Sequence, residues 1–172
     1  MNLTPNALAI DILSLSILIS FGIAVYSWRG RHFSPAARPF FLTQIALIGW
    51  MFSILMILAR PVAEFQQFWL AFQGVFSAFF SPFLLQFSVK FSQKSWPSQK
   101  IWIFIWIVQV SLILLALSNG THNLLWEGVP DGSGDVPYRI KPIAYGFFGF
   151  TVFLNAVSTV IFGQQVWQQR KL

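Results

Sequence analysis

Five polar side chains that interrupt long apolar stretches are the strongest candidates for chemistry in this sequence. They are Gln73, Ser77, Ser81, Gln109 and Asn155. An amide or hydroxyl group buried in apolar surroundings costs free energy unless it finds a hydrogen-bond partner. The first three are spaced four residues apart, so they share one face of a helix. Side chains of this kind, placed together inside a membrane, can hold the polar head group of a ligand.

Two interpretations fit this polar set. In the first, the side chains hydrogen-bond to one another between helices, a contact worth about 1 kcal/mol or less in membrane proteins. In the second, they line a cavity between helices that binds a quinone, a lipid or another small ligand. The sequence leaves both interpretations open.

The two histidines are the other candidates for chemistry. His122 lies close to Trp126, at the expected membrane surface, where it could be a single axial ligand to a pigment or haem. His32 is predicted on the opposite side of the membrane, so the two cannot bind one metal together. The sequence has no cysteine and no HExxH, GxSxG or phosphate-binding motif. We therefore predict no catalytic residue, no metal site and no enzymatic activity.

Composition indicates the solvent around these residues. Of the 172 residues, 56% are hydrophobic and only 9% are charged, and the mean hydropathy is +0.65. Soluble domains carry roughly 25% charged residues. The chain is therefore predicted to be a single membrane domain over residues 1–172. The net charge of +6 comes from short loops between apolar runs, so we expect no nucleic-acid partner.

Five apolar runs are long enough to cross a bilayer, which predicts an all-α bundle of five transmembrane helices. They cover about residues 7–28, 40–59, 64–90, 101–117 and 143–167, and the longest polar loop is 118–142. Within this loop, the stretch VPDGSGDVP predicts the turn of a small hairpin. Two rows of small side chains predict close helix packing: Ser16, Ser20 and Ala24 in the first span, and Ala46, Gly49 and Ser53 in the second.

The span 64–90 is the predicted centre of the bundle. Pro82 lies well inside it and is expected to kink the helix. Five phenylalanines follow a helical period and form one predicted stripe: Phe72, Phe76, Phe79, Phe83 and Phe87. Such a stripe can contact lipid, a protein partner or an aromatic pigment.

The distribution of basic residues predicts the orientation. One side of the membrane holds Arg29, Arg31, Arg38, Lys90, Lys94, Lys100, Arg170 and Lys171, and the other holds Arg60, Arg139, Lys141 and all five acids. The positive-inside rule then places the C-terminus in the cytoplasm and the N-terminus outside. We predict a multi-pass protein of the bacterial cytoplasmic (inner) membrane, with loop 118–142 facing outward.

Two segments carry a family resemblance. The run Pro82–Phe91, PFLLQFSVKF, and the segment Ser118–Trp126, SNGTHNLLW, resemble the ending of the third helix and an Asn-x-x-His-x-Leu-x-Trp motif in one family. This family is the seven-helix N-terminal membrane sensor region of bacterial histidine kinases and diguanylate cyclases. The resemblance implies an outward N-terminus and a membrane sensor that passes a signal to a cytoplasmic domain.

Departures from that family pattern leave a second hypothesis open. The chain has five predicted spans, without counterparts of helices six and seven or of an output domain, so a signal is expected to pass through another protein. The competing hypothesis is an accessory subunit of a respiratory or photosynthetic membrane complex, contacting lipid, quinone or pigment. On either hypothesis, we expect membrane lipids and other membrane protein subunits as partners.

Overall fold

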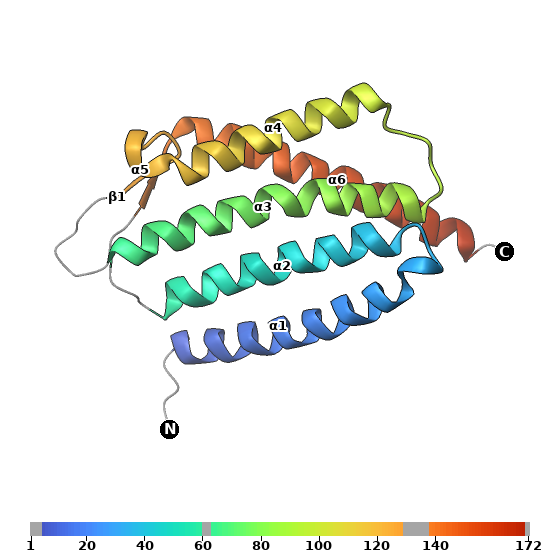
Figure 1. Ribbon diagram of the computed structural model, residues 1–172, viewed down its shortest axis with the longest axis horizontal. Helices are drawn as coiled ribbons and strands as arrows, with labels where there is room; N and C mark the ends of the chain where they lie inside the picture. The colour runs from blue at the N-terminus through green and yellow to red at the C-terminus, as the bar shows by residue number, and fades with distance from the viewer. Residues whose placement is uncertain (1–4, 60–62, 129–137, 171–172) are drawn as a thin grey trace.

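The computed structural model describes residues 5–59, 63–128 and 138–170, and these residues form long helices lying side by side (Figure 1). The long helices are α1 (Pro5–Arg29), α2 (Ala37–Leu58), α3 (Ala63–Phe91), α4 (Gln99–Leu117) and α6 (Pro142–Gln169). Short elements are η1 (Gly30–His32), α5 (Asn119–His122), β1 (Trp126–Gly128) and β2 (Tyr138–Ile140). Within the described residues, five helices are long and apolar enough to span a membrane. The predicted five-helix membrane bundle is thus confirmed.

Helix α3 is the centre of the bundle. It packs against α2 on one side and against α4 and α6 on the other, whereas α1 packs mainly against α2 (Figure 1). Each long helix is antiparallel to its neighbour along the chain, and α6 therefore runs in the same direction as α3. The central place predicted for this span agrees with the structure.

Small residues let the helices approach closely. A β-carbon added to Gly49 of α2 would overlap the ring of Phe76, so this phenylalanine of α3 fills the space that a side chain would need. A β-carbon on Gly74 of α3 would lie 3.2 Å from that of Ala116 on α4. In α1, Ser20 and Ala24 are buried. The predicted small-residue faces are therefore contact faces.

A cluster of buried hydrophobic side chains lies between α3, α4 and α6, away from the hairpin. Its buried members are Leu85, Val89, Ile105, Leu154 and Ile161. Two contacts join the end of α3 and the following loop to α6 at the same end of the bundle. The Ser92 hydroxyl donates to the Ile161 carbonyl at 3.4 Å, and the Lys94 Nζ donates to the Gln164 Oε1 at 2.9 Å.

The predicted phenylalanine stripe is divided among several helices. Phe83 packs against Trp106 of α4 with ring centroids 5.5 Å apart, and Phe87 packs against Phe40 of α2 at 4.8 Å. Because α3 is surrounded by three helices, even neighbouring positions of one stripe contact different elements. These rings contact protein side chains within the bundle.

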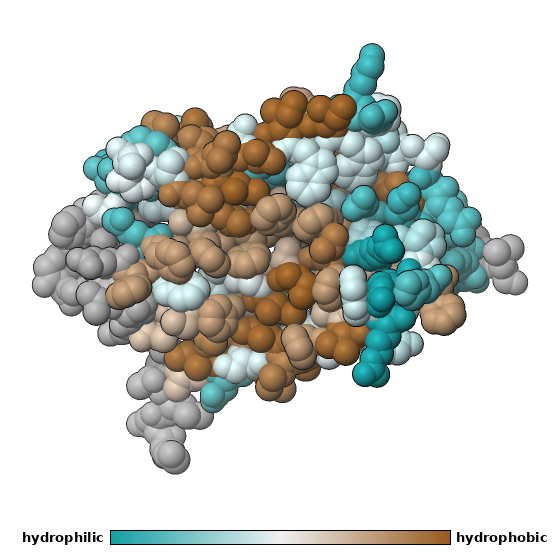
Figure 2. All heavy atoms as spheres, in the orientation of Figure 1, coloured by the Kyte–Doolittle hydropathy of each residue, from teal (hydrophilic) through white to brown (hydrophobic). Residues whose placement is uncertain are grey.

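Charge and apolar surface are separated along the long axis. Figure 2 shows apolar side chains over the middle of the bundle and hydrophilic ones at the end that holds η1 and the α3–α4 connection. The described basic residues of that end are Arg29, Arg31, Arg38, Lys90, Lys94, Lys100 and Arg170. Three parts of the chain named in the sequence analysis lie outside the described residues: Arg60, the hairpin tip at 129–137 and Lys171.

Candidate functional site

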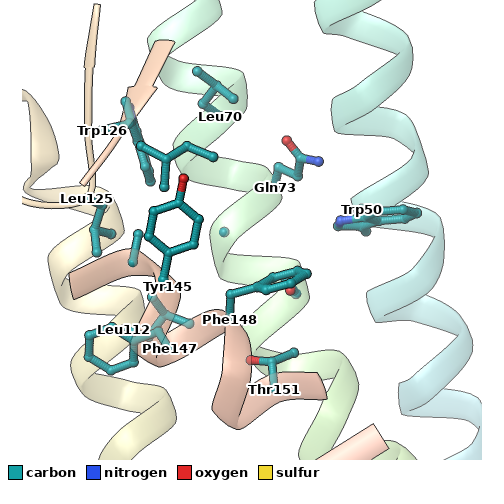
Figure 3. Close-up of a pocket in the computed structure, with 14 residues that line it drawn as sticks. Trp50, Leu70, Gln73, Leu112, Leu125, Trp126, Tyr145, Phe147, Phe148 and Thr151 are labelled. Carbon is teal, nitrogen blue, oxygen red and sulfur yellow. The ribbon is translucent and has the colours of Figure 1, made fainter. Parts of the chain in front are cut away.

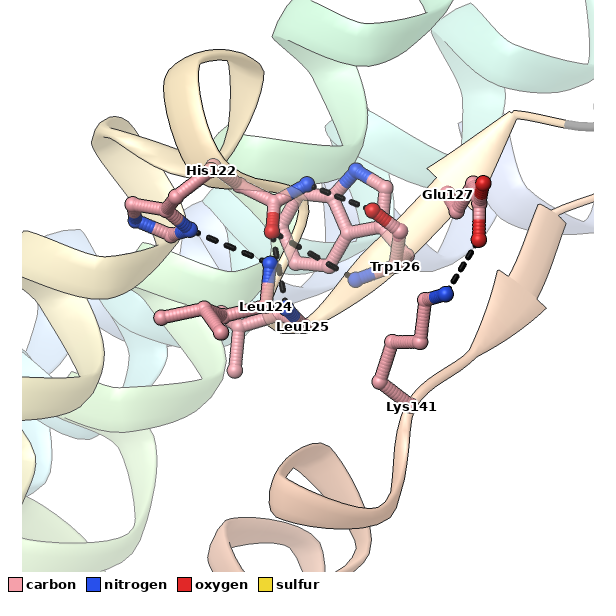
Figure 4. A network of polar contacts seen from close by, with 7 residues as sticks. His122, Leu124, Leu125, Trp126, Glu127 and Lys141 are labelled. Atoms are coloured by element: carbon pink, nitrogen blue, oxygen red, sulfur yellow. Dashed lines mark hydrogen bonds and ion pairs between the residues drawn. The ribbon is translucent and has the colours of Figure 1, made fainter.

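The connection between α4 and α6 is fixed by one buried amide. Asn119 is 3% exposed, and its Oδ1 accepts hydrogen bonds from the backbone N–H groups of Leu125 at 2.8 Å and Trp126 at 3.4 Å (Figure 4). Its Nδ2 donates to the Trp126 carbonyl at 2.8 Å. These bonds hold the start of β1 against the end of the bundle. Strand β1 then pairs with β2 in an antiparallel hairpin, as the polar loop predicted.

His122 shapes the turn that precedes this strand. Its Nδ1 accepts a hydrogen bond from the backbone N–H of Leu124 at 3.1 Å, and its Nε2 lies 3.0 Å from the Ser118 hydroxyl oxygen. That hydroxyl donates to the Leu114 carbonyl at 2.6 Å, so in its contact with His122 the Ser118 oxygen accepts and the Nε2 donates. Both ring nitrogens are thus engaged, and an axial bond to a haem or pigment would have to replace one of these contacts.

An ion pair closes the base of the hairpin. Lys141, directly before α6, donates its Nζ to the Glu127 carboxylate of β1 (Figure 4). This hydrogen bond is the main cause that lowers the pKa of Glu127 below its usual value, and the positive charge of Lys141 lowers the pKa further. The Lys141 backbone N–H also donates to the Leu125 carbonyl at 2.9 Å. The hairpin is thereby tied to the beginning of α6.

Beneath the hairpin lies a cavity of about 490 Å³ between α2, α3, α4 and α6 (Figure 3). Its size is within the range of small-molecule sites, roughly 300–1,000 Å³. The residues that line it are Trp50, Leu70, Gln73, Gly74, Ser77, Leu112, Leu125, Trp126, Ile140, Ala144, Tyr145, Phe147, Phe148 and Thr151. All of them come from the half of the bundle that carries the hairpin.

The cavity lining combines polar side chains with aromatic ones. Gln73 and Ser77 of α3 and Thr151 of α6 supply an amide and two hydroxyl groups. Tyr145 and Phe148 are 61% and 68% exposed, so the cavity opens beside large aromatic rings on the apolar surface of the helices. The described lining contains no charged side chain, so the site suits an uncharged ligand that is mainly apolar and carries hydrogen-bonding groups.

The structure groups the seven residues proposed from the sequence into three places. Gln73, Ser77 and Trp126 line the cavity. Ser81 and Asn155 follow lining residues of α3 and α6 by one helical turn, and Gln109 precedes a lining residue of the antiparallel α4 by about one turn, so all three lie farther from the hairpin than the lining. His122 belongs to the turn above the cavity, outside its lining.

Sequence reasoning missed the aromatic wall of the cavity, formed by Trp50, Tyr145 and Phe148. Aromatic residues are abundant throughout the chain, and the same residue types face lipid elsewhere. Only the close approach of α2 and α6 to α3 distinguishes these three rings from the others.

A comparison with known families places this arrangement in context. The family model described as the N-terminal 7TM region of histidine kinase matches residues 12–172. The chain belongs to this family. The match covers almost all of α1, the other four long helices and the hairpin, and it confirms the resemblance to histidine kinase sensor regions seen at Pro82–Phe91 and Ser118–Trp126. No curated protein and no solved structure matches the chain.

Membership of the 7TM family defines the coarse character of the protein. It is a multi-pass membrane protein, and the family to which it belongs is a sensor region of histidine kinases that is not itself the catalytic part. The family description names seven transmembrane segments, and the described residues of this chain contain five candidate spans.

Proposed function

We propose that this protein is a membrane sensor module that binds an uncharged, lipid-like or quinone-like ligand in the cavity under the β-hairpin. The observation that carries the proposal is the lining: a neutral amide and three hydroxyl groups, one of them on Tyr145, within an aromatic wall, in a chain of the histidine kinase 7TM family. An amide, hydroxyls and aromatic rings offer binding and orientation, and they provide no acid–base pair. Binding without catalysis is therefore the function that we assign.

The proposed orientation follows from charge. Seven described basic residues gather at the end opposite the hairpin, as expected for a cytoplasmic face. With this orientation, the cavity lies near the outer face of a bacterial inner membrane and the C-terminal end of α6 lies at the cytoplasmic face. We propose that ligand binding is passed along α3 and α6 to a cytoplasmic output domain, on the same polypeptide or on a partner protein.

The mouth of the cavity supports entry from the bilayer. Tyr145 and Phe148 are mostly exposed on the apolar surface, and Trp50 lies on the opposing α2 (Figure 3). Aromatic rings at such a position are compatible with lipid tails and with an apolar ligand alike. A ligand that is dissolved in the membrane can therefore reach the amide of Gln73 without crossing the polar hairpin.

A matched pair of ligands tests this proposal in the full chain reconstituted in lipid nanodiscs. Decylubiquinone is uncharged, whereas decanoate has a chain of the same length and a negative charge. We expect decylubiquinone to raise the unfolding temperature and decanoate to leave it unchanged. The variant Gln73→Leu should lose the stabilisation, while Gln44→Leu, which changes an amide outside the cavity, should retain it. Equal responses to both ligands, or an unchanged response of Gln73→Leu, would contradict the proposal.

The competing role, an accessory subunit of a larger membrane complex, is tested by extraction in a mild detergent followed by native mass analysis. Co-migration with a large complex that absorbs visible light would support the subunit role. A small monodisperse species without a chromophore would support the sensor role.

A further inference from the structure

Three polar side chains lie one turn below the cavity, and the third, Asn155, is partly exposed but has a buried Oδ1. Ser81 on α3 and Gln109 on α4 are completely buried. The Ser81 hydroxyl, both amide atoms of Gln109 and the Oδ1 of Asn155 on α6 make no hydrogen bond with any described residue. Other buried hydroxyl groups of the bundle behave differently: that of Ser53 donates to the Gly49 carbonyl at 2.8 Å, and that of Ser158 to the Leu154 carbonyl at 2.7 Å.

The helix registers bring the three side chains to one level. Ser77 and Thr151 both line the cavity, and Ser81 and Asn155 follow them by four residues on the parallel helices α3 and α6. On the antiparallel α4, Gln109 precedes the lining residue Leu112 by three residues. Because a helical turn takes 3.6 residues, all three lie about one turn deeper than the cavity lining.

A second register supports the pairing of Ser81 with Gln109. Gly74 and Ala116 mark one point where α3 and α4 approach closely. Ser81 follows Gly74 by seven residues, and Gln109 precedes Ala116 by seven, both in the direction away from the hairpin. Seven residues make about two turns, so both side chains return to the facing sides of their helices.

Pro82 removes one helical hydrogen-bond donor at this level. Proline has no N–H group, so the carbonyl of Ala78, four residues earlier, lacks its helical donor. Both Ala78 and Pro82 are buried. In transmembrane helices, neighbouring side chains and ordered water commonly satisfy such a freed carbonyl.

Each unsatisfied buried polar group carries a desolvation penalty, and several lie together here. The groups include donors and acceptors without any charge, the combination that a buried water molecule pairs best. We infer that Ser81, Gln109 and Asn155 form a buried hydration site beside Pro82, continuous with the cavity above it. Water at this site replaces the backbone donor that Pro82 lacks. The inference goes beyond the proposed function and needs no ligand.

The absence of cysteine from the sequence permits a direct test. Ser81→Cys introduces a thiol of nearly the same shape as the hydroxyl group, and Ser53→Cys and Ser158→Cys are controls at equally buried positions. A thiol reacts through its thiolate, which forms far less readily in dry apolar surroundings. In nanodiscs at pH 8, we expect methyl methanethiosulfonate to modify Ser81→Cys at least about tenfold faster than either control, measured by intact mass.

Two further variants keep the test decisive. Gln109→Met, combined with Ser81→Cys, removes a partner of the water and should slow the modification, and an unchanged rate would overturn the shared site. Asn155→Cys probes the same level from α6 and should also react rapidly, even if Ser81→Cys does not fold. If the folded variants react no faster than the controls, the hydration site is refuted, whatever the result of the decylubiquinone experiment.

Discussion

Two buried amides, Asn119 and Gln109, lie on opposite sides of the cavity and differ in how they are satisfied. Asn119 is 3% exposed and makes three hydrogen bonds to the backbone of the β1 segment. Gln109 is 0% exposed, and neither of its amide atoms has a partner among the described residues. The first amide pairs backbone groups in the turn that leads into β1. The second lies between long helices, and its two amide atoms are left for a partner other than the described residues.

The largest effect on the free energy of unfolding is expected at Asn119, whose side-chain amide makes three hydrogen bonds. Asn119→Leu should lower the free energy of unfolding by about 2–4 kcal/mol, because it leaves the buried Leu125 N–H and other groups without partners. Thermal unfolding in nanodiscs measures this loss. Asn123→Gly is the control, since Asn123 is exposed and has a φ of 50°, which glycine adopts easily. A stable Asn119→Leu variant would remove the distinction between the two amides.

At Gln109, below the cavity, we expect a smaller effect of the opposite sign on the free energy of unfolding. Gln109→Met preserves the length of the side chain and removes its polar atoms, so the free energy of unfolding should stay unchanged or rise by about 1 kcal/mol. The same unfolding measurement compares this variant directly with Asn119→Leu. A loss as large as that of Asn119→Leu would mean that Gln109 is a structural amide as well.

The smallest effect is expected at the exposed ion pair between Glu127 and Lys141. Because Lys141 lowers the pKa of Glu127 in the folded protein, the pair stabilises the fold above the ordinary glutamate pKa of about 4.3. This contribution is lost as the pH falls through the lowered pKa. The unfolding temperatures of the wild type and Glu127→Gln should therefore differ slightly at pH 7 and converge in strong acid. High salt should also reduce the difference, and a difference that persists in acid would assign the effect to another group.

The sequence predicts the helical part of this fold well because it is dictated by the bilayer. Long apolar runs identify all five spans, and the helices begin and end within a few residues of the predicted bounds. Rows of small residues around Ala24 and Gly49 correctly indicate which faces meet. The phenylalanine stripe misleads, because periodicity reveals a shared helix face and not the number of neighbouring helices around it.

The residues of the candidate site are harder to predict from the sequence than the helices are. Gln73, Ser77 and Trp126 were proposed as ligand-binding residues and line the cavity, and a polar residue within an apolar run is a visible signal. Tyr145 and Phe148 give no such signal, since a ring that faces lipid looks the same as one that borders a cavity. The hydrogen bonds of Asn119 depend on a chain reversal that residue types alone do not specify.

The cavity opens beside exposed aromatic rings, which affects the ligand concentration needed to occupy it. If a ligand reaches Gln73 from among the lipid tails, its effective concentration is that in the bilayer and is set by its partition coefficient. Two ligands with equal contacts in the cavity would then differ tenfold in potency for every tenfold difference in partitioning, equivalent to about 1.4 kcal/mol. The lipid composition of the cell would thereby adjust the sensitivity of the protein without any change in its sequence.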